Sequence, residues 1–303
     1  MKKFTKNLLF ITVIFSTILN YAQEAKGNNS LIENEDYNLY KPINTQGVLL
    51  LFGGFPENAE GIENEFQITN LAIEKNVAVA YLNFNRKLWL EEDEKEQLAL
   101  SLQELFTSNN LPSDNIYIGG LSSGGNMALL ISNYLSQKSE YNLNPAGVFI
   151  VDSPVDLAAL YRIAESNIKR KFSEASVGES TFIFNYFHDQ LGNPNDTIAL
   201  YEKYAAFTYE TKDFQNLKDL KKTKIRFYTE PDKVWWKENM GVDYEQMNAF
   251  HIKRLSDFLS SQDFENVQFI ATENKGFRAD GTKNPHSWSI IDKEDLLKWM
   301  LKD

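Results

Sequence analysis

The sequence predicts an α/β protein with a mainly parallel sheet flanked by helices on both faces. Short apolar runs alternate along the chain with longer amphipathic stretches, which is the pattern of strands joined by helical crossovers. The clearest of these runs are continuously apolar, as expected of strands that are buried on both faces. The length of 303 residues suits one large domain, with or without an insertion, or two small ones.

The composition excludes several classes of protein. The chain has 31 Lys and Arg against 42 Asp and Glu, no cysteine and three histidines. A net charge of −11 leaves no excess of cations for phosphate groups, so we expect no nucleic-acid partner. Disulfides, thiolate nucleophiles and cysteine-ligated zinc are excluded, and three histidines offer little material for a multi-histidine metal centre.

Residues 1–22 have the three parts of a secretory signal peptide: a basic start, a short apolar run over residues 8–15, and the small residue Ala22 before the expected cut. A membrane anchor is the alternative, but the apolar stretch is shorter than the roughly 20 residues needed to span a bilayer. We therefore expect export to the periplasm or the exterior. The mature domain, residues 23–303, should then have no membrane attachment.

Residues 24–35 are polar and are expected to form a linker, after which the elements follow in order. The predicted strands are residues 48–52, 77–82, 115–118, 147–151, 225–228 and 267–271. Apolar residues at helical spacing predict helices over residues 62–73, 91–106, from the glycine-rich turn to about 137, 247–258 and 290–301. The acidic residues 91–94 suit the positive end of a helix dipole.

One connection is too long for a simple crossover. Residues 153–222 separate two consecutive strands and contain helical patterns and many aromatic residues. We expect this segment to include a cap over the carboxyl edge of the sheet; an enlarged crossover that covers nothing is the alternative.

Gly120-Leu121-Ser122-Ser123-Gly124 matches the G-x-S-x-G pattern of a nucleophile elbow. The sharp turn requires small residues two positions before and two after the nucleophile. Glycines hold both positions around Ser122, whereas Ser123 would have the bulky Leu121 at one of them. Because a predicted strand runs into the motif and a predicted helix leaves it, Ser122 is the expected nucleophile. A glycine-rich turn without chemistry is the alternative.

A serine nucleophile needs a base, and histidine is the obvious choice in a chain without cysteine. His286 follows the last strand and precedes the last helix, where a loop can hold an imidazole over the carboxyl edge of the sheet. His188, in the expected cap, and His251, on the apolar side of a helix, are the alternatives.

The residue that orients the imidazole is expected to be a carboxylate after a strand. Asp232 follows the predicted strand over residues 225–228, which comes before the last strand and His286, and is our first choice. Glu230 and Asp152 are the alternatives, and Asp232 can also be explained as a turn residue beside Pro231.

An oxyanion hole requires two converging donors. The backbone N–H of Ser123 is one. The second is expected from the glycine turn after residue 52, where Gly54 is our first choice and Phe55 the next. A tight turn without this role is the alternative.

Together, the glycine turn after an early strand, the elbow at residues 120–124, Asp232 and the late His286 resemble the α/β-hydrolase fold serine hydrolases, the esterases and lipases. The resemblance covers about residues 37–303. It implies an eight-stranded, mostly parallel sheet with a cap between its sixth and seventh strands, which agrees with the long connection. Phe52 is a departure, because many relatives have histidine there.

The resemblance implies hydrolysis of a carboxylic ester through an acyl-enzyme, without a metal or organic cofactor. The substrate would be a small-molecule or carbohydrate-linked ester. Four tryptophans expected near the site (Trp89, Trp235, Trp236 and Trp288) would suit a sugar ring or an aromatic acyl group; ordinary core residues are the alternative. A serine peptidase of the same fold and a non-catalytic binding protein that retains the fold are the alternatives. The sequence does not indicate the oligomeric state.

Overall fold

The structure is a computed structural model that describes residues 30–84 and 87–302. The predicted signal peptide, residues 1–22, lies outside the described residues. None of the described helices has the length and apolarity needed to cross a membrane.

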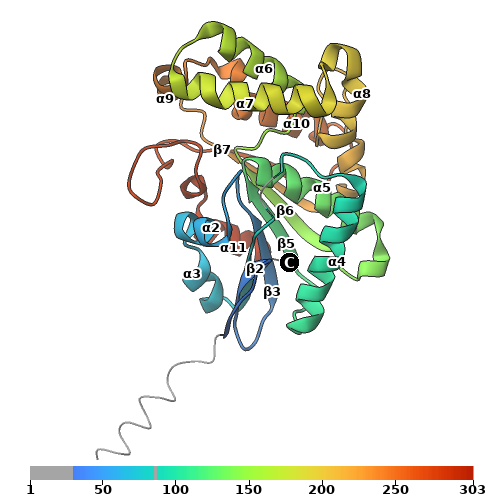
Figure 1. The fold of residues 1–303 in the computed structure, drawn as a ribbon. Coiled ribbons are helices and arrows are strands. Elements are labelled where there is room, and N and C mark those ends of the chain that lie inside the picture. The colour runs from blue at the N-terminus through green and yellow to red at the C-terminus, as the bar shows by residue number, and fades with distance from the viewer. Residues whose placement is uncertain (1–29, 85–86, 303) are drawn as a thin grey trace, which may run out of the picture.

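The described chain forms one eight-stranded sheet in the order β1-β2-β4-β3-β5-β6-β7-β8 (Figure 1). The strands are β1 (Ser30–Glu33), β2 (Tyr37–Lys41), β3 (Gly47–Phe52), β4 (Val77–Leu82), β5 (Ile116–Leu121), β6 (Pro145–Val151), β7 (Lys224–Thr229) and β8 (Val267–Ala271). β2 pairs antiparallel with β1 and β4, and all other pairs are parallel. The predicted fold class is confirmed.

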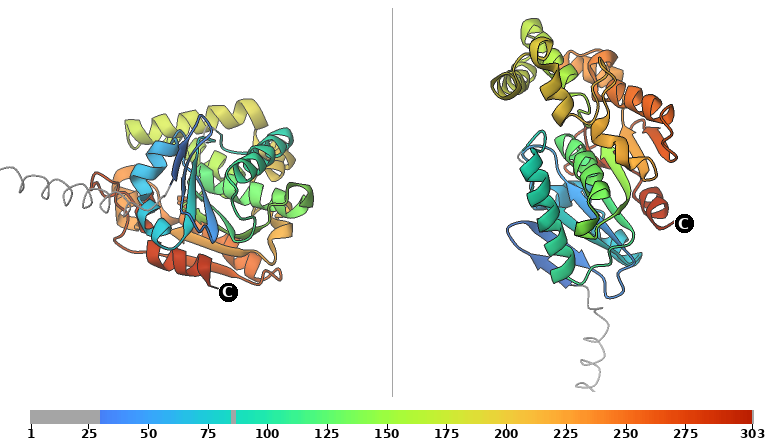
Figure 2. Two further views of the ribbon diagram at one scale, coloured as in Figure 1. Left: turned by 90° about the horizontal axis from the view of Figure 1, so that it is seen from below. Right: turned by 90° about the vertical axis from the view of Figure 1, so that its right-hand side faces the viewer.

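The described helices pack on both faces of the sheet and at one of its ends (Figure 1). They are α2 (Ala59–Phe66), α3 (Thr69–Glu74), α4 (Glu92–Ser108), α5 (Ser123–Gln137), α6 (Leu157–Arg170), α7 (Glu174–Leu191), α8 (Pro194–Tyr204), α9 (Lys233–Met240), α10 (Asn248–Ser260) and α11 (Lys293–Leu301), with short 3₁₀ turns η1 (Ser139–Tyr141), η2 (Gln215–Leu220), η3 (Tyr244–Gln246) and η4 (Trp288–Ile290). One core lies between the sheet and α4, α5 and α10, and a second lies between the sheet and α2, α3 and α11. Figure 2 shows these layers from two further directions.

The strand β3 shows why the sheet needs two covered faces. Val48, Leu50 and Phe52 belong to the first core, whereas Leu49 and Leu51 belong to the second. Successive side chains of a strand point to opposite faces, so a continuously apolar strand is stable only when both faces are packed.

Two expectations differ from the structure. Residues 30–33, part of the expected linker, form the edge strand β1, whose side chains are mostly exposed and therefore give little apolar signal. The helix predicted over residues 62–73 is two helices, because Gln67 adopts a left-handed conformation (φ 48°) that ends α2.

The connection between β6 and β7 contains α6, α7 and α8, which we call the insertion helices. They lie together at the end of the sheet to which β6 and β7 run (Figures 1 and 2). They have a core of their own, in which Tyr161, Phe187 and Tyr201 are buried. The insertion leaves and returns at one place, because the Phe207 N–H donates to the Val155 carbonyl at 3.0 Å.

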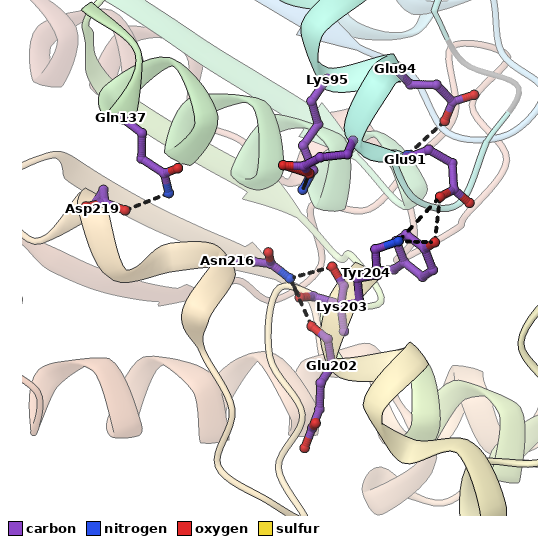
Figure 3. Close-up of polar contacts among 11 residues, drawn as sticks. Glu91, Glu94, Lys95, Gln137, Glu202, Lys203, Tyr204, Asn216 and Asp219 are labelled. Atoms are coloured by element: carbon purple, nitrogen blue, oxygen red, sulfur yellow. Dashed lines mark hydrogen bonds and ion pairs between the residues drawn. The ribbon is translucent and has the colours of Figure 1, made fainter.

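Polar contacts fasten the returning end of the insertion to the helices of the first core (Figure 3). The Tyr204 hydroxyl donates to the Glu91 carboxylate at 2.5 Å. The side-chain amide of Asn216 donates to three carbonyls, those of Glu202 at 3.0 Å, Lys203 at 3.1 Å and Ala205 at 2.8 Å. The Glu202 and Lys203 carbonyls belong to the last turn of α8, where carbonyls have no N–H partner within the helix. The Asn216 side chain therefore caps the C-terminal end of α8.

We predict that Asn216→Ala lowers the free energy of unfolding by about 1–2 kcal/mol, because the carbonyls lose their shared donor in a partly buried position. Asn239→Ala is the matched control. The Asn239 amide makes a single exposed bond to the Trp235 carbonyl, so we expect a change within about 0.5 kcal/mol. Urea unfolding of both variants measures the difference, and equal effects would contradict the capping role.

Candidate active site

Ser122 stands in a strained turn between β5 and α5. Its backbone has φ 54° and ψ −128°, which a residue with a side chain adopts only when its surroundings enforce it. The Ser122 N–H donates to the Val151 carbonyl of the next strand at 2.9 Å, and the Gly125 N–H donates to the Ser122 carbonyl at 3.0 Å. Both bonds hold the turn in place.

The glycines of the motif are required by close packing. A Cβ on Gly120 would lie 2.1 Å from the Gly124 carbonyl oxygen, and a Cβ on Gly124 would lie 2.3 Å from the Gly53 carbonyl oxygen. No side chain fits at such distances. The strand β5, the helix α5 and the turn after β3 therefore meet at Ser122 with only backbone between them.

His286 is bonded to Asp152. The His286 Nδ1 and Asp152 Oδ2 atoms are 2.6 Å apart. Asp152 directly follows β6 and is 2% exposed. The Thr229 hydroxyl donates to its other carboxylate oxygen at 3.2 Å, and the Asn248 amide donates to its carbonyl at 2.8 Å. A carboxylate held in this way fixes the orientation and the tautomer of the imidazole.

The first choice for the acid, Asp232, does not contact His286. Its carboxylate caps α9 through the Trp235 N–H at 2.9 Å and pairs with the Lys283 ammonium at 2.5 Å. The bond from Lys283 lowers the pKa of Asp232. Asp232 therefore has the turn and capping role, and the geometry assigns the orienting position to Asp152. Nearness to His286 along the chain does not identify the acid: Asp232 follows β7, whereas Asp152 follows β6, which lies between β5 and β7 in the sheet.

The other alternative, Glu230, holds the loop that carries His286. Its buried carboxylate accepts the N–H groups of Lys275 at 2.8 Å and Gly276 at 3.1 Å, together with the Thr272 hydroxyl at 3.0 Å. These bonds use its lone pairs and leave it no contact with the His286 ring among the described residues. Sequence reasoning named Glu230 but not this loop-holding role.

The other two histidines lie apart from Ser122. The His188 ring faces the Tyr161 hydroxyl within the insertion, with Nδ1 3.1 Å from the oxygen. His251 lies on α10, where burial lowers its pKa. Of the three histidines, His286 alone lines the same cavity as Ser122.

The expected oxyanion donors are placed as follows. The Gly54 N–H donates to the Glu57 carboxylate at 3.1 Å, so it is engaged within its own turn. The Phe55 N–H instead donates to the Ser123 hydroxyl at 3.0 Å, which brings it to the first turn of α5 beside the Ser123 N–H. Because Phe55 and Ser123 line the cavity and Gly54 does not, the geometry favours Phe55 over Gly54.

The cavity has a volume of about 420 Å³ and lies between the sheet edge and the insertion. Ser122 and His286 line it on the side of the sheet, and Leu160 of α6 and Ile183 of α7 line it on the side of the insertion. Two of the four tryptophans expected here, Trp235 and Trp236, line it. The other two are buried elsewhere, Trp89 beneath the insertion helices and Trp288 against Phe66.

These groups supply the parts of nucleophilic catalysis: a hydroxyl on a strained turn, an imidazole with a carboxylate behind it, and N–H groups at the positive end of α5. Within residues 30–84 and 87–302, no three His, Asp or Glu side chains form a group that could hold a metal ion.

This sheet order and the serine turn after β5 define the α/β-hydrolase fold. No protein-family model and no curated protein matches the sequence. Solved structures match over most of the chain. A structure from work on two esterases of Rhizomucor miehei has a TM-score of 0.55 and 12% identity, over 99% of this chain and 92% of that one.

Two further structures agree. The fluorophosphonate-binding serine hydrolase FphF of Staphylococcus aureus has a TM-score of 0.53 and 13% identity, over 91% of this chain and 98% of that one. An α/β hydrolase of Vibrio vulnificus has a TM-score of 0.50 and 15% identity, over 95% and 86%. The resemblance that the sequence indicates is thus confirmed at the level of fold.

We predict that Asp152→Asn lowers the reactivity of Ser122 about a thousandfold or more, because an amide cannot stabilise the imidazolium and permits the wrong tautomer. Asp232→Asn is the matched control and should stay within a few-fold of the unmodified protein, since its partner is Lys283. The rate of labelling by a fluorophosphonate probe measures both. A larger loss of labelling in Asp232→Asn than in Asp152→Asn would instead indicate that Asp232 orients the imidazole.

We also predict that Gly54→Ala reduces this labelling about tenfold. The new Cβ would lie 3.0 Å from the Ser122 Cβ and would shift the nucleophile, and small misplacements are costly at a reacting centre. Gly178→Ala, on α7, places its Cβ in open space and should leave labelling unchanged. Equal labelling of both variants would show that the Ser122 turn tolerates the shift.

Proposed function

We propose that this protein is an exported serine hydrolase that cleaves carboxylic esters through an acyl-enzyme on Ser122. One geometric fact supports this most: Ser122 and His286 line one cavity, and the His286 ring is bonded to the buried Asp152. The esterases and serine hydrolases among the structures of the same fold agree with it.

In the proposed reaction, the Ser122 hydroxyl oxygen attacks the acyl carbon of the ester. The Nε2 atom of His286, the ring nitrogen that does not face Asp152, takes the hydroxyl proton and passes it to the leaving alkoxide. Asp152 keeps the other ring proton on Nδ1 and stabilises the cation that forms. Water, activated by the same imidazole, then frees the acyl group.

The negative oxygen of the tetrahedral intermediate would be stabilised by the N–H groups of Ser123 and Phe55. The Phe55 N–H would have to leave the Ser123 hydroxyl, its present acceptor. This exchange is inexpensive, because a serine hydroxyl rotates freely and an anionic acceptor makes a stronger bond than a neutral one.

The proposed function also involves an N-terminal signal peptide and a cap over the cavity. Residues 1–22 would be removed as a signal peptide, which N-terminal sequencing of the secreted protein tests directly. The segment 153–222 would act as a cap that limits the size of the substrate. Its helices α6 and α7 contribute Leu160, Ile163 and Ile183 to the cavity, in support of this role.

We expect a fluorophosphonate probe to label the purified protein, and p-nitrophenyl esters of short acids to be hydrolysed. Ser122→Ala should abolish both. Ser261→Ala is the control, because Ser261 is exposed on the surface and its hydroxyl donates only to the Phe258 carbonyl.

Labelling that survives Ser122→Ala, or an absence of turnover across acyl chain lengths, would contradict the proposal. The p-nitroanilide with the same acyl group separates esterase from peptidase. An esterase should favour the ester by several orders of magnitude in kcat/KM, and comparable rates would support the peptidase.

A further inference from the structure

The walls of the cavity beside Ser122 are mostly apolar, and few of its side chains carry a charge. Leu160, Ile163, Trp235, Trp236 and Met240 are among its apolar lining residues. Apart from His286, the charged side chains that line it are Glu179 and Arg278. Glu179 is exposed on α7, whereas Arg278 is half-buried in the loop that carries His286.

The Arg278 guanidinium has no ion pair and no hydrogen bond within the described part of the chain. Glu57 and Asp280 lie near enough for their charges to attract Arg278, but neither forms an ion pair with it within the described residues. Glu57 accepts the Gly54 N–H and the Trp288 indole N–H, and Asp280 accepts the Thr282 N–H at 2.8 Å. Within the described residues, attraction without direct contact is all that compensates this half-buried cation, and partial burial removes water that would otherwise solvate it.

The backbone of Arg278 is anchored. Its N–H donates to the Thr282 carbonyl at 2.8 Å, and its carbonyl accepts the Gly281 N–H at 2.9 Å. The next N–H, that of Ala279, donates to Glu65 at the end of α2 at 3.2 Å. Arg278 therefore stands on the side of the cavity where the turn after β3 and Phe55 lie.

Electrostatics agree with this placement. Burial raises the pKa of Glu57, and the charge of Arg278 opposes that rise, so the guanidinium acts on the turn that holds Gly54. The chain as a whole carries a net charge of −11, and its long-range field disfavours anions. An anionic ligand would thus have to be recognised by a local cation, and the planar guanidinium fork matches a carboxylate.

We propose that the substrate is an ester that also carries a carboxylate, which Arg278 binds while the apolar remainder packs against α6, α7 and α9. This inference rests on the proposed esterase function. It adds a substrate class, an anionic ester, and a specificity-determining residue, Arg278.

Two matched pairs of esters test the inference, one for each side of the scissile bond. The first compares p-nitrophenyl hexanoate with the mono-p-nitrophenyl ester of adipic acid. The second compares phenyl butyrate with p-carboxyphenyl butyrate. We expect the carboxylate member of at least one pair to have the higher kcat/KM in the unmodified protein.

In Arg278→Gln, kcat/KM for that carboxylate ester should fall about tenfold to a hundredfold, mainly through KM. The neutral member of the pair should stay within about twofold, because this change leaves Ser122 and His286 untouched. Arg278→Lys keeps the charge but loses the fork, so it should retain part of the preference. It also provides a second variant if Arg278→Gln folds poorly.

Arg162→Gln is the matched control, since Arg162 pairs with Glu210 and lies outside this cavity. It removes the same charge and should leave the carboxylate preference intact. An equal loss in both variants, or a preference for the neutral esters in the unmodified protein, would overturn the anion site while the esterase function stands. If no ester of either pair is hydrolysed, the esterase function fails and the anion site fails with it.

Discussion

The candidate site depends on the backbone contact at Ser122, where the turn after β3, the end of β5 and the start of α5 touch without side chains between them. The Ser122 conformation costs about 1–3 kcal/mol in isolation and persists only because its surroundings impose it. Gly120 and Gly124 allow that close approach, and the β6 carbonyl of Val151 fixes the Ser122 N–H. The two-sided apolar packing of β3 and β5 supplies the rigidity against which the strain is held.

Two carboxylates that follow neighbouring strands position His286. Asp152, after β6, bonds to the ring itself, and Glu230, after β7, bonds to the loop backbone. The imidazole is thus held both at its nitrogen and through its chain. Glu230 organises the loop through hydrogen bonds from the backbone N–H groups of Lys275 and Gly276.

The sequence predicted the fold, and it indicated Ser122 as the candidate nucleophile, because both produce local patterns. Apolar runs mark the six parallel strands β3 to β8, and the glycine spacing singles out Ser122 over Ser123. The acid could not be ranked in the same way. Asp152, Glu230 and Asp232 all follow strands, and the choice among them depends on lateral strand order and loop path, which are set by tertiary packing. The edge strand β1 was missed because an exposed strand needs no apolar side chains.

The sequence also could not decide which backbone N–H of the turn after β3, that of Gly54 or that of Phe55, faces the cavity. Glycine signals freedom of the backbone but not the direction of an N–H, and the Glu57 side chain that takes the Gly54 N–H lies three residues further on. Which of two adjacent amides faces the cavity is decided by such contacts.

The insertion departs from the sheet and rejoins it at neighbouring points. The Phe207 N–H reaches the Val155 carbonyl, and the Tyr209 N–H reaches the Asp156 carboxylate at 3.0 Å. Asp152 lies before this junction and is tied to β7 through its N–H on the Tyr228 carbonyl at 2.8 Å. The segment between Asp156 and Phe207 is therefore a natural module for grafting. A chimaera spliced there would exchange the roof of the cavity while the acid, the histidine loop and the elbow keep their own supports.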